Sequence, residues 1–325
     1  MKAILVSAFG DENVLEYKDV PTPEPEAGEV RVRLGAAGVN PVETYIRSGK
    51  YGKLPELPYT PGNDGAGIVD AVGPGVTRLA EGDKVFVAAT LARRNTGTYA
   101  EYVVCDADSV HALPPSLPFT QGAGLGTPGL AAANALFARG GLQPGETVLV
   151  HGASGGVGTL AVQLARRAGA LVIGTAGTQE GMDLVTQLGA HHVFNHREQG
   201  YEKKVVAAAK GRGPDLVIEM LANENLPRDL DMIARYGRVV IVGSRGPLEF
   251  NPRDTMVKDA VVRGILINNM TREEYVANMF RLAAALESGM RVAVNEELPL
   301  EQAPEAHRQV MKPGQSGKVM LTMKM

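Results

Sequence analysis

Three glycines stand at regular spacing in the middle of the chain, within the segment VLVHGASGGVGTLAVQLARRAGALVIGTAGT. Gly152, Gly155 and Gly158 lie between an apolar, strand-like run that ends at His151 and an amphipathic, helix-like run over 156–167. Glycine lets the backbone turn tightly and lets a phosphate approach the free N–H groups of a helix N-terminus. A second apolar run follows, so the segment predicts a dinucleotide-binding strand, turn and helix, with a tight structural turn as the alternative.

The end of the second strand of this unit indicates which dinucleotide is bound. NAD-selective sites carry an acidic residue there, about 20 positions beyond the glycine turn, to hold the ribose hydroxyls. Here the strand ends GTAGT, from Gly174 to Thr178, and the next carboxylate is Glu180. A carboxylate at the strand end would repel the 2′-phosphate of NADP. Its absence predicts NADPH as the cofactor, and an Asp placed at Thr175 is expected to favour NAD.

Nearby side chains offer groups that a 2′-phosphate requires. Thr178 can donate a hydrogen bond. His196 and Arg197, which follow the third strand-like run in FNHRE, can supply donor or positive groups. The alternative for His196 and Arg197 is a solvated loop.

Composition gives several classes of function no support. Lys and Arg total 33 against 36 Asp and Glu, for a net charge of -3, and there is no basic run to track a nucleic-acid backbone. Cys105 is the single cysteine, which excludes an internal disulfide and fits a reducing compartment. The N-terminal MKAILVSAFG contains only a short apolar run. Neither a signal peptide nor a membrane span is expected, and the prediction is a cytoplasmic protein.

The elements that must position these residues change character along the chain. Up to about residue 118, short β-like segments alternate with Gly and Pro turns, which predicts a β-rich domain. From about residue 122, apolar strands alternate with longer amphipathic segments, which predicts a parallel sheet with crossover helices. The final strand-like GKVMLTMKM does not extend that sheet simply and is assigned to the first domain. The sequence predicts an α/β protein with domains 1–123 plus 268–325 and 124–267.

Long sequence blocks resemble the zeta-crystallin-like group of zinc-free quinone oxidoreductases, in the medium-chain dehydrogenase/reductase superfamily. The blocks cover nearly the whole chain and include GVNPVETYIRSGKYGKLPELPYTPGNDGAGIVDAVG, GDKVF, GTYAEYVV, VLVHGASGGVG, GAHHVFNHRE, VIEMLAN, GRVVIVGSRG and NPRDTM. The resemblance implies a GroES-like catalytic domain made from both ends of the chain, a Rossmann domain between them, and an active site in the cleft. It also implies a homodimer or homotetramer.

The resemblance further implies which residues contact the cofactor. Together with Thr178 they are Tyr45, Ser154, Gly155, Gly156, Val157, Gly177, His196, Asn225, Val242, Gly243, Ser244, Arg245, Ile265, Leu266 and Ile267. Asn40 and Tyr45 match the active-site loop of the family and are predicted to be catalytic, as neutral donors to a substrate oxygen. The alternatives are a turn Asn before Pro41 and a packed Tyr.

A metal centre is not expected. Zinc alcohol dehydrogenases of the superfamily place a cysteine at the position of Asn40 and a His–Glu pair at the positions of Asn63 and Asp64. Asn is a poor zinc ligand, and one carboxylate does not build a tetrahedral site of N and S donors. Glu43 and Asp64 are isolated in the sequence, so no carboxylate pair is predicted either.

The absence of zinc ligands restricts the substrates that are expected. A simple ketone needs its developing alkoxide stabilised by a metal or an acid, whereas aromatisation drives the reduction of a quinone. The prediction is an NADPH-dependent quinone reductase that works by hydride or stepwise electron transfer. One alternative is a reductase of activated C=C bonds, with Tyr45 as the proton donor. The other is a crystallin-like protein that binds NADPH and AU-rich RNA with little catalysis. The family often has a Thr-Ala-aromatic run where this chain has Ala131–Ala133, and these alanines are expected to enlarge that side of the site.

Overall fold

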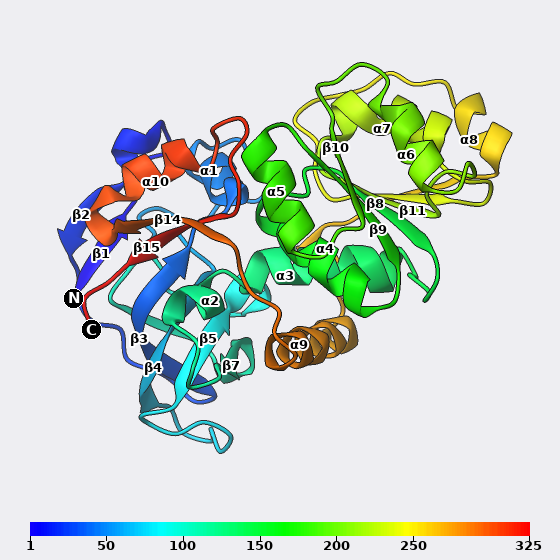
Figure 1. Ribbon diagram of the computed structural model, residues 1–325. Helices are drawn as coiled ribbons and strands as arrows, with labels where there is room; N and C mark the ends of the chain where they lie inside the picture. The colour runs from blue at the N-terminus through cyan, green and yellow to red at the C-terminus, as the bar shows by residue number, and fades with distance from the viewer. The chain divides into compact units, whose positions relative to one another are not determined.

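The computed structural model describes all residues, 1–325, and they form two compact units. The first unit comprises Met1–Pro128 and Val292–Met325, and the second comprises Gly129–Arg291. The chain passes into the second unit within α3 (Gly126–Ala133), and both termini lie in the first unit (Figure 1). No helix is long and apolar enough to cross a membrane.

The first unit is built on a seven-stranded sheet of order β14-β15-β3-β4-β5-β7, with β6 paired to β3. Its strands are β3 (Glu29–Gly38), β4 (Asp64–Val72), β5 (Lys84–Ala88), β6 (Tyr102–Asp106), β7 (Val110–Ala112), β14 (Val294–Pro299) and β15 (Lys318–Thr322). Alternate residues of β3, Val30, Val32 and Leu34, are fully buried because one face of the strand packs on the core. The C-terminal strand β15 pairs antiparallel with β3 and parallel with β14, so both ends of the chain build this sheet.

Short elements complete the first unit. They are the antiparallel pair β1 (Lys2–Leu5) and β2 (Glu16–Asp19), and the helices α1 (Pro41–Arg47), α2 (Phe119–Ala123) and α10 (Ala303–Gln309). α1 starts at Pro41, where a missing N–H costs nothing and the fixed φ suits the first helical position. The Glu43 carboxylate accepts a hydrogen bond from the N–H of Asn40 at 2.8 Å, which closes the first turn of α1.

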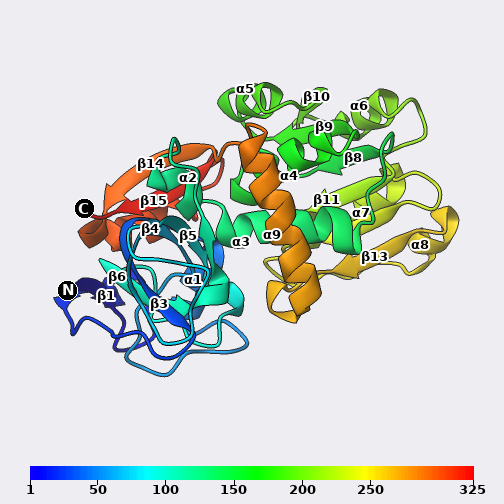
Figure 2. The ribbon, with the colours of Figure 1, turned by 90° about the horizontal axis from the view of Figure 1, so that it is seen from below.

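The second unit is built on a six-stranded parallel sheet of order β10-β9-β8-β11-β12-β13, and Figure 2 shows its strands side by side. The strands are β8 (Thr147–Val150), β9 (Leu171–Ala176), β10 (His192–Asn195), β11 (Leu216–Glu219), β12 (Arg238–Ile241) and β13 (Val261–Gly264). Val148, Leu149 and Val150 are fully buried, as expected for a strand covered on both faces. This is the doubly wound order of a Rossmann domain. The predicted α/β fold, with a Rossmann domain and a β-rich domain, is confirmed.

Helices follow the strands of the parallel sheet. They are α4 (Gly156–Arg167), α5 (Gln179–Gln187), α6 (Tyr201–Ala208), α7 (Ala222–Met232), α8 (Arg253–Lys258) and α9 (Arg272–Glu287). α3 continues into a π-helical turn, η4 (Asn134–Arg139), and the alanines of 131–133 are buried in α3. The first turn of α4 follows the glycine turn directly, so the predicted strand, turn and helix are all present.

Residues 268–291 belong to the second unit, whereas the sequence analysis placed them in the first. The reason is the packing of α9, whose Tyr275, Met279 and Leu282 are buried. Arg139 of η4 forms an ion pair with Glu274 at the start of α9. After α9, the side chain of Gln163 in α4 holds the backbone of residue 291 at both its N–H and its carbonyl. The boundary therefore moves from 268 to 292.

Candidate functional site

The predicted cofactor residues of the second unit gather at one edge of its parallel sheet. The strands end at residues 150, 176, 195, 219, 241 and 264. The carboxyl ends of parallel strands meet at one edge, where doubly wound sheets bind ligands at the point at which the strand order reverses. That point lies between β8 and β11 here. The residues that follow these ends are Ser154–Val157, Gly177 and Thr178, His196, Asn225, Val242–Arg245 and Ile265–Ile267.

The glycines of the turn after β8 have different roles. Gly152 has a φ of 53°, in the left-handed region that favours glycine. A Cβ on Gly158 would lie 2.3 Å from the carbonyl oxygen of Gly152, so Gly158 permits the close packing of α4. A Cβ on Gly155, the N-cap of α4, would meet only that same oxygen, at 3.4 Å. The fold does not require a glycine at 155, and its small size leaves the N–H groups of the first turn of α4 open to an anion.

Cationic and donor side chains cover the end of β9. A Cβ on Gly177 would lie 2.9 Å from Nε of Arg197 and 3.0 Å from Nε2 of His196. Both side chains come from the loop after β10, and both residues are exposed. Thr178 caps α5, and its Oγ1 accepts a hydrogen bond from the N–H of Gly181 at 3.1 Å. These groups suit a phosphate on the ribose, because Arg presents a fixed fork of donors that matches phosphate geometry.

Thr175 is not the position that selects between NAD and NADP. It is fully buried within β9, which continues to Ala176, and its Oγ1 lies 3.1 Å from Nδ1 of His151. A carboxylate at this position would be buried in the sheet rather than facing a ribose. The expectation for an Asp at Thr175 is therefore wrong, because β9 ends at Ala176 and Gly177 is the first residue after it.

Hydrogen bonds fix the first turn of α7 against the loop after β12. The side-chain oxygen of Asn223 accepts from the hydroxyl of Ser244 at 3.2 Å and from the N–H of Arg245 at 2.8 Å. A Cβ on Gly243 would lie 2.6 Å from the carbonyl oxygen of Met220, so a glycine is needed there. After β13, the side chain of Leu266 is 48% exposed, which leaves an apolar surface at the same edge.

Asn40, a predicted catalytic residue, is buried in the first unit with its side chain fully engaged. Its Nδ2 donates to Oε1 of Glu43 at 3.1 Å and to Oδ2 of Asp64 at 2.8 Å. Its Oδ1 accepts from the Nζ of Lys318. Glu43 and Asp64 are thus not isolated as the sequence suggested, because the neighbouring strands β15, β3 and β4 bring these regions together.

The two carboxylates are held by further donors. Asp64 accepts from both the N–H and the hydroxyl of Thr127 at 2.7 Å, and Glu43 accepts from the hydroxyl of Tyr99 at 2.6 Å. Burial raises the pKa of Glu43 and of Asp64, and the Lys318 ammonium opposes that rise. Burial also lowers the pKa of Lys318 itself. One buried lysine and two buried carboxyls thus form a single hydrogen-bonded group with Asn40, named here the Asn40 network.

Tyr45, the other predicted catalytic residue, lies on α1, two residues after Glu43. It is half-buried, and its hydroxyl has no hydrogen-bond partner within the chain. The two predicted residues therefore differ, because both amide hydrogens of Asn40 are used whereas the Tyr45 hydroxyl is free. A direct role for either remains a prediction.

The Asn40 network does not fit a zinc ion. Its donor set offers no thiolate or imidazole, and the Lys318 ammonium at Asn40 Oδ1 would repel a second cation. Cys105 is buried in β6, where burial raises the pKa of its thiol to about 12. A protonated, buried thiol is not a metal ligand.

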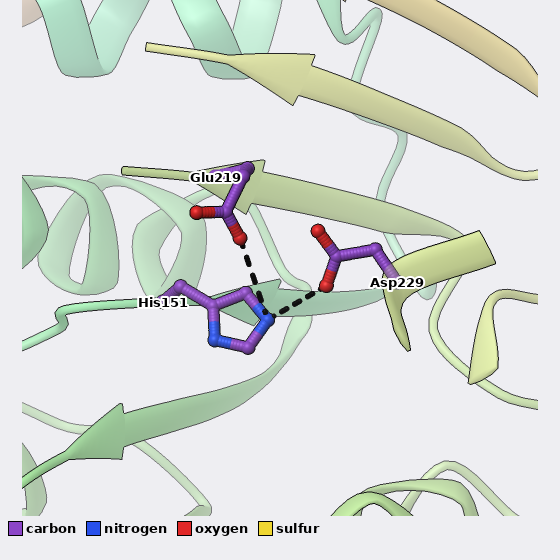
Figure 3. A group of neighbouring side chains, drawn as sticks. All are labelled: His151, Glu219 and Asp229. Atoms are coloured by element: carbon purple, nitrogen blue, oxygen red, sulfur yellow. Dashed lines mark hydrogen bonds and ion pairs between the residues drawn. The ribbon is translucent and has the colours of Figure 1, made fainter. Parts of the chain in front are cut away.

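One cluster in the second unit was missed by sequence reasoning. His151, Glu219 and Asp229 are all buried, and the Nε2 of His151 lies 2.8 Å from Oδ1 of Asp229 and 3.7 Å from Oε2 of Glu219 (Figure 3). His151 follows β8 and Glu219 ends β11, so these two flank the point where the strand order reverses. His151 and Glu219 stand at the ends of two apolar, strand-like runs, and this was the sequence signal that could have identified them. Asp229, on α7, carries no such signal.

Comparison with known proteins places the chain in a family. A family model described as alcohol dehydrogenase GroES-like domain matches residues 26–115, and one described as zinc-binding dehydrogenase matches residues 156–285. The quinone oxidoreductase of Mus musculus is 46% identical over 99% of this chain and 98% of its own length.

Solved structures agree on the fold. The quinone oxidoreductase of Escherichia coli complexed with NADPH has a TM-score of 0.89 at 30% identity, covering 99% of this chain and 100% of that chain. A structure described as an NAD-dependent alcohol dehydrogenase has a TM-score of 0.90 at 30% identity and covers 100% of both chains. Likeness of fold alone therefore does not choose between the dinucleotides. The identity to curated relatives over almost the full length shows that the chain belongs to the quinone oxidoreductase family of the medium-chain dehydrogenase/reductase superfamily.

Proposed function

We propose that the protein is an NADPH-dependent quinone reductase. The observation that supports the cofactor best is the end of β9, where Arg197 and His196 cover Gly177 and no carboxylate is present. The substrate class follows from relatives named quinone oxidoreductase that are 44% to 47% identical over almost the whole chain.

The second unit holds the groups that the phosphates of NADPH need. The N–H groups at the start of α4 favour an anion, and Gly155 leaves them open. The hydroxyls of Ser154 and Thr178 face the same place, because a Cβ on Gly181 would lie 3.1 Å from each of them. We assign the pyrophosphate to the start of α4 and the 2′-phosphate to Arg197, His196 and Thr178.

Bound NADPH supplies the reducing equivalents, as a hydride or as electrons in separate steps. A quinone becomes aromatic on reduction, so the protein needs to provide only neutral donors and a proton. The free hydroxyl of Tyr45 is the proposed donor. Asn40 is proposed to act indirectly, because its bonds to Glu43 and Asp64 hold the start of the helix that carries Tyr45.

We also propose that the protein is a homo-oligomer. β13 is an edge strand of its sheet, and Val261 on this strand is 42% exposed. Exposed apolar side chains on an edge strand mark a surface that a second copy can cover.

The substrate class is tested by initial rates of NADPH oxidation with 1,2-naphthoquinone, 9,10-phenanthrenequinone and a 2-alkenal. The proposal predicts turnover of the quinones and little or none of the alkenal. Activity on the alkenal alone would assign the protein to reduction of C=C bonds instead. Binding of AU-rich RNA in a gel shift, with no turnover of any substrate, would support the crystallin-like alternative.

A further inference from the structure

Behind the residues that face the cofactor, we propose that His151, Glu219 and Asp229 form a positioning unit. Its task is to fix the orientation of Asn225, and with it the loop after β11, for dinucleotide binding. The inference rests on the proposed function, because Asn225 matters only where a dinucleotide binds.

Glu219 sets the orientation of Asn225 directly. Its Oε1 accepts hydrogen bonds from the N–H of Leu221 and from Nδ2 of Asn225, the latter at 3.1 Å. Since that oxygen can only accept, the NH₂ group of Asn225 must face Glu219, and its carbonyl oxygen must face away. This carbonyl oxygen has no partner within the chain, and Asn225 is only partly buried. It is therefore presented as an acceptor for an N–H or O–H group of the ligand.

The other two residues lie beside the second carboxyl oxygen of Glu219, with Nε2 of His151 3.7 Å from Oε2. Figure 3 shows the His151 ring with its Nε2 directed at both carboxyl groups. The opposite ring nitrogen, Nδ1, lies 3.1 Å from Oγ1 of Thr175, and the carbonyl of Thr175 accepts from the N–H of Ala153 at 2.8 Å. The cluster thus connects the ends of β8, β9 and β11 to α7, at the point where the strand order reverses.

The cluster contains two buried carboxyls and no lysine or arginine, and burial favours a proton on it. Oε2 of Glu219 and Oδ2 of Asp229 are buried with no hydrogen-bond partner. Burial raises the pKa of both carboxyls to about 7, and burial lowers the pKa of His151. The other charged or aromatic groups that face the cluster are Arg228, Glu202, His196 and Tyr201. A proton on Glu219 Oε2 leaves Oε1 an acceptor, so the hold on Asn225 is kept in either state.

A divalent cation is the other way to neutralise this group, since one ligand atom of each residue lies within 4.8 Å of the others. The contacts favour the proton. Nε2 of His151 is already 2.8 Å from Asp229, and Glu219 Oε1 is used by Leu221 and Asn225. Structural zinc sites take four protein ligands, and the cluster provides three. The experiment must therefore distinguish a bound metal ion from a bound proton.

The experiment measures the Kd for NADPH by fluorescence titration of four variants. Glu219→Leu removes the acceptor, and Glu219→Gln keeps an acceptor oxygen in the same shape. Asn225→Leu removes the oriented amide, and the fourth variant combines Glu219→Leu with Asn225→Leu. Asp231→Leu, at an exposed position of α7, the helix that also carries Asn225, is the matched control. Metal content of the wild type and of Asp229→Asn is measured in parallel.

The inference predicts that Glu219→Leu and Asn225→Leu each raise the Kd at least about tenfold, the effect of losing one oriented hydrogen bond. The double variant should lose no more than either single variant, because the two residues act through one contact. Glu219→Gln and the control should stay within about threefold of the wild type. If Glu219→Leu does not fold, Asn225→Leu and Glu219→Gln still decide the case.

Three results would overturn the inference. They are unchanged affinity in Asn225→Leu, a large loss in folded Glu219→Gln, and fully additive losses in the double variant. Stoichiometric metal in the wild type that is lost in Asp229→Asn would also overturn it and assign a metal site. A wild type that does not bind NADPH would instead defeat the proposed function, and the inference with it.

Discussion

At the residue scale, the chain places a lysine among buried carboxyls where zinc relatives of the superfamily are expected to bind metal. Lys318, the first residue of β15, donates to the carbonyl of Val39 at 2.7 Å and to Asn40, and it interacts with the charges of Glu43 and Asp64. Removing one partner from a buried ion group leaves uncompensated charge, which is far more costly than the loss of a surface pair.

Lys318→Met is expected to lower the free energy of unfolding by about 3 to 5 kcal/mol near neutral pH, because Glu43 and Asp64 lose their cation. Without the ammonium, the pKa of both carboxyls rises further, so the folded protein binds more protons than the unfolded chain. The loss should therefore grow as the pH rises and shrink as it falls. Urea unfolding at about pH 6 and pH 8 measures this, with exposed Lys312→Met as the control. Equal effects of the two variants at both pH values would contradict the assignment.

Gly177→Asp tests the cofactor assignment at a single residue. The new carboxylate would meet only the far ends of the flexible Arg197 and His196 side chains, so the fold should tolerate it. It would also repel a 2′-phosphate and pair with Arg197. The ratio of kcat/KM for NADPH to that for NADH should fall at least about tenfold. Serine at the same position, which adds a side chain without charge, is the comparison, and an unchanged ratio in the Asp variant would show that the 2′-phosphate lies elsewhere.

At the scale of elements, the turn between β8 and α4 contains one glycine that the fold requires and one that ligand binding is expected to require. Gly158 is required by the close approach of α4 to the Gly152 carbonyl, whereas a Cβ on Gly155 would make a single contact, with the same oxygen at 3.4 Å. Substitutions at the two glycines are thus expected to have different effects. A change at Gly155 should weaken ligand binding, and a change at Gly158 should lower stability.

Gly155→Val should weaken NADPH binding by more than about tenfold, while the weaker N-cap costs only about 1 kcal/mol of stability. Gly158→Ala should instead destabilise the protein by about 1 to 3 kcal/mol, because its Cβ would clash with backbone atoms that cannot easily move. Calorimetry and NADPH titration on both variants measure the two effects. Normal affinity in a folded Gly155→Val would remove the pyrophosphate from the start of α4.

Elements with strong local patterns could be predicted from the sequence. The apolar runs and the glycine turn identify the strands and the start of α4, because period and turn residues are local signals. The contact of Asn40 with Lys318 could not be predicted, because only the order of the strands brings residues 40 and 318 together. Burial of Thr175 was also hidden, since a strand covered on both faces shows no alternation. The unit to which α9 belongs depends on its packing partner, which its own sequence does not reveal.

At the scale of the whole molecule, the proposed oligomer depends on the exposed apolar side chain of Val261 on β13. Val261→Lys should shift the mass measured by light scattering towards the monomer, because it places a charge on the edge strand that a second copy would cover. Val276→Lys, at an exposed apolar position on α9, is the matched control. An unchanged mass in the β13 variant, or an equal shift in the control, would exclude this edge as the interface.

The central claim is reduction of a quinone at the expense of NADPH, and the most direct measurement is kcat/KM of the wild type for 1,2-naphthoquinone with NADPH and with NADH. Arg197 and His196 at the end of β9, with no carboxylate beside them, predict a value at least about tenfold higher with NADPH. Equal values would contradict the cofactor assignment. No turnover of the quinone with either cofactor would contradict the proposed function itself.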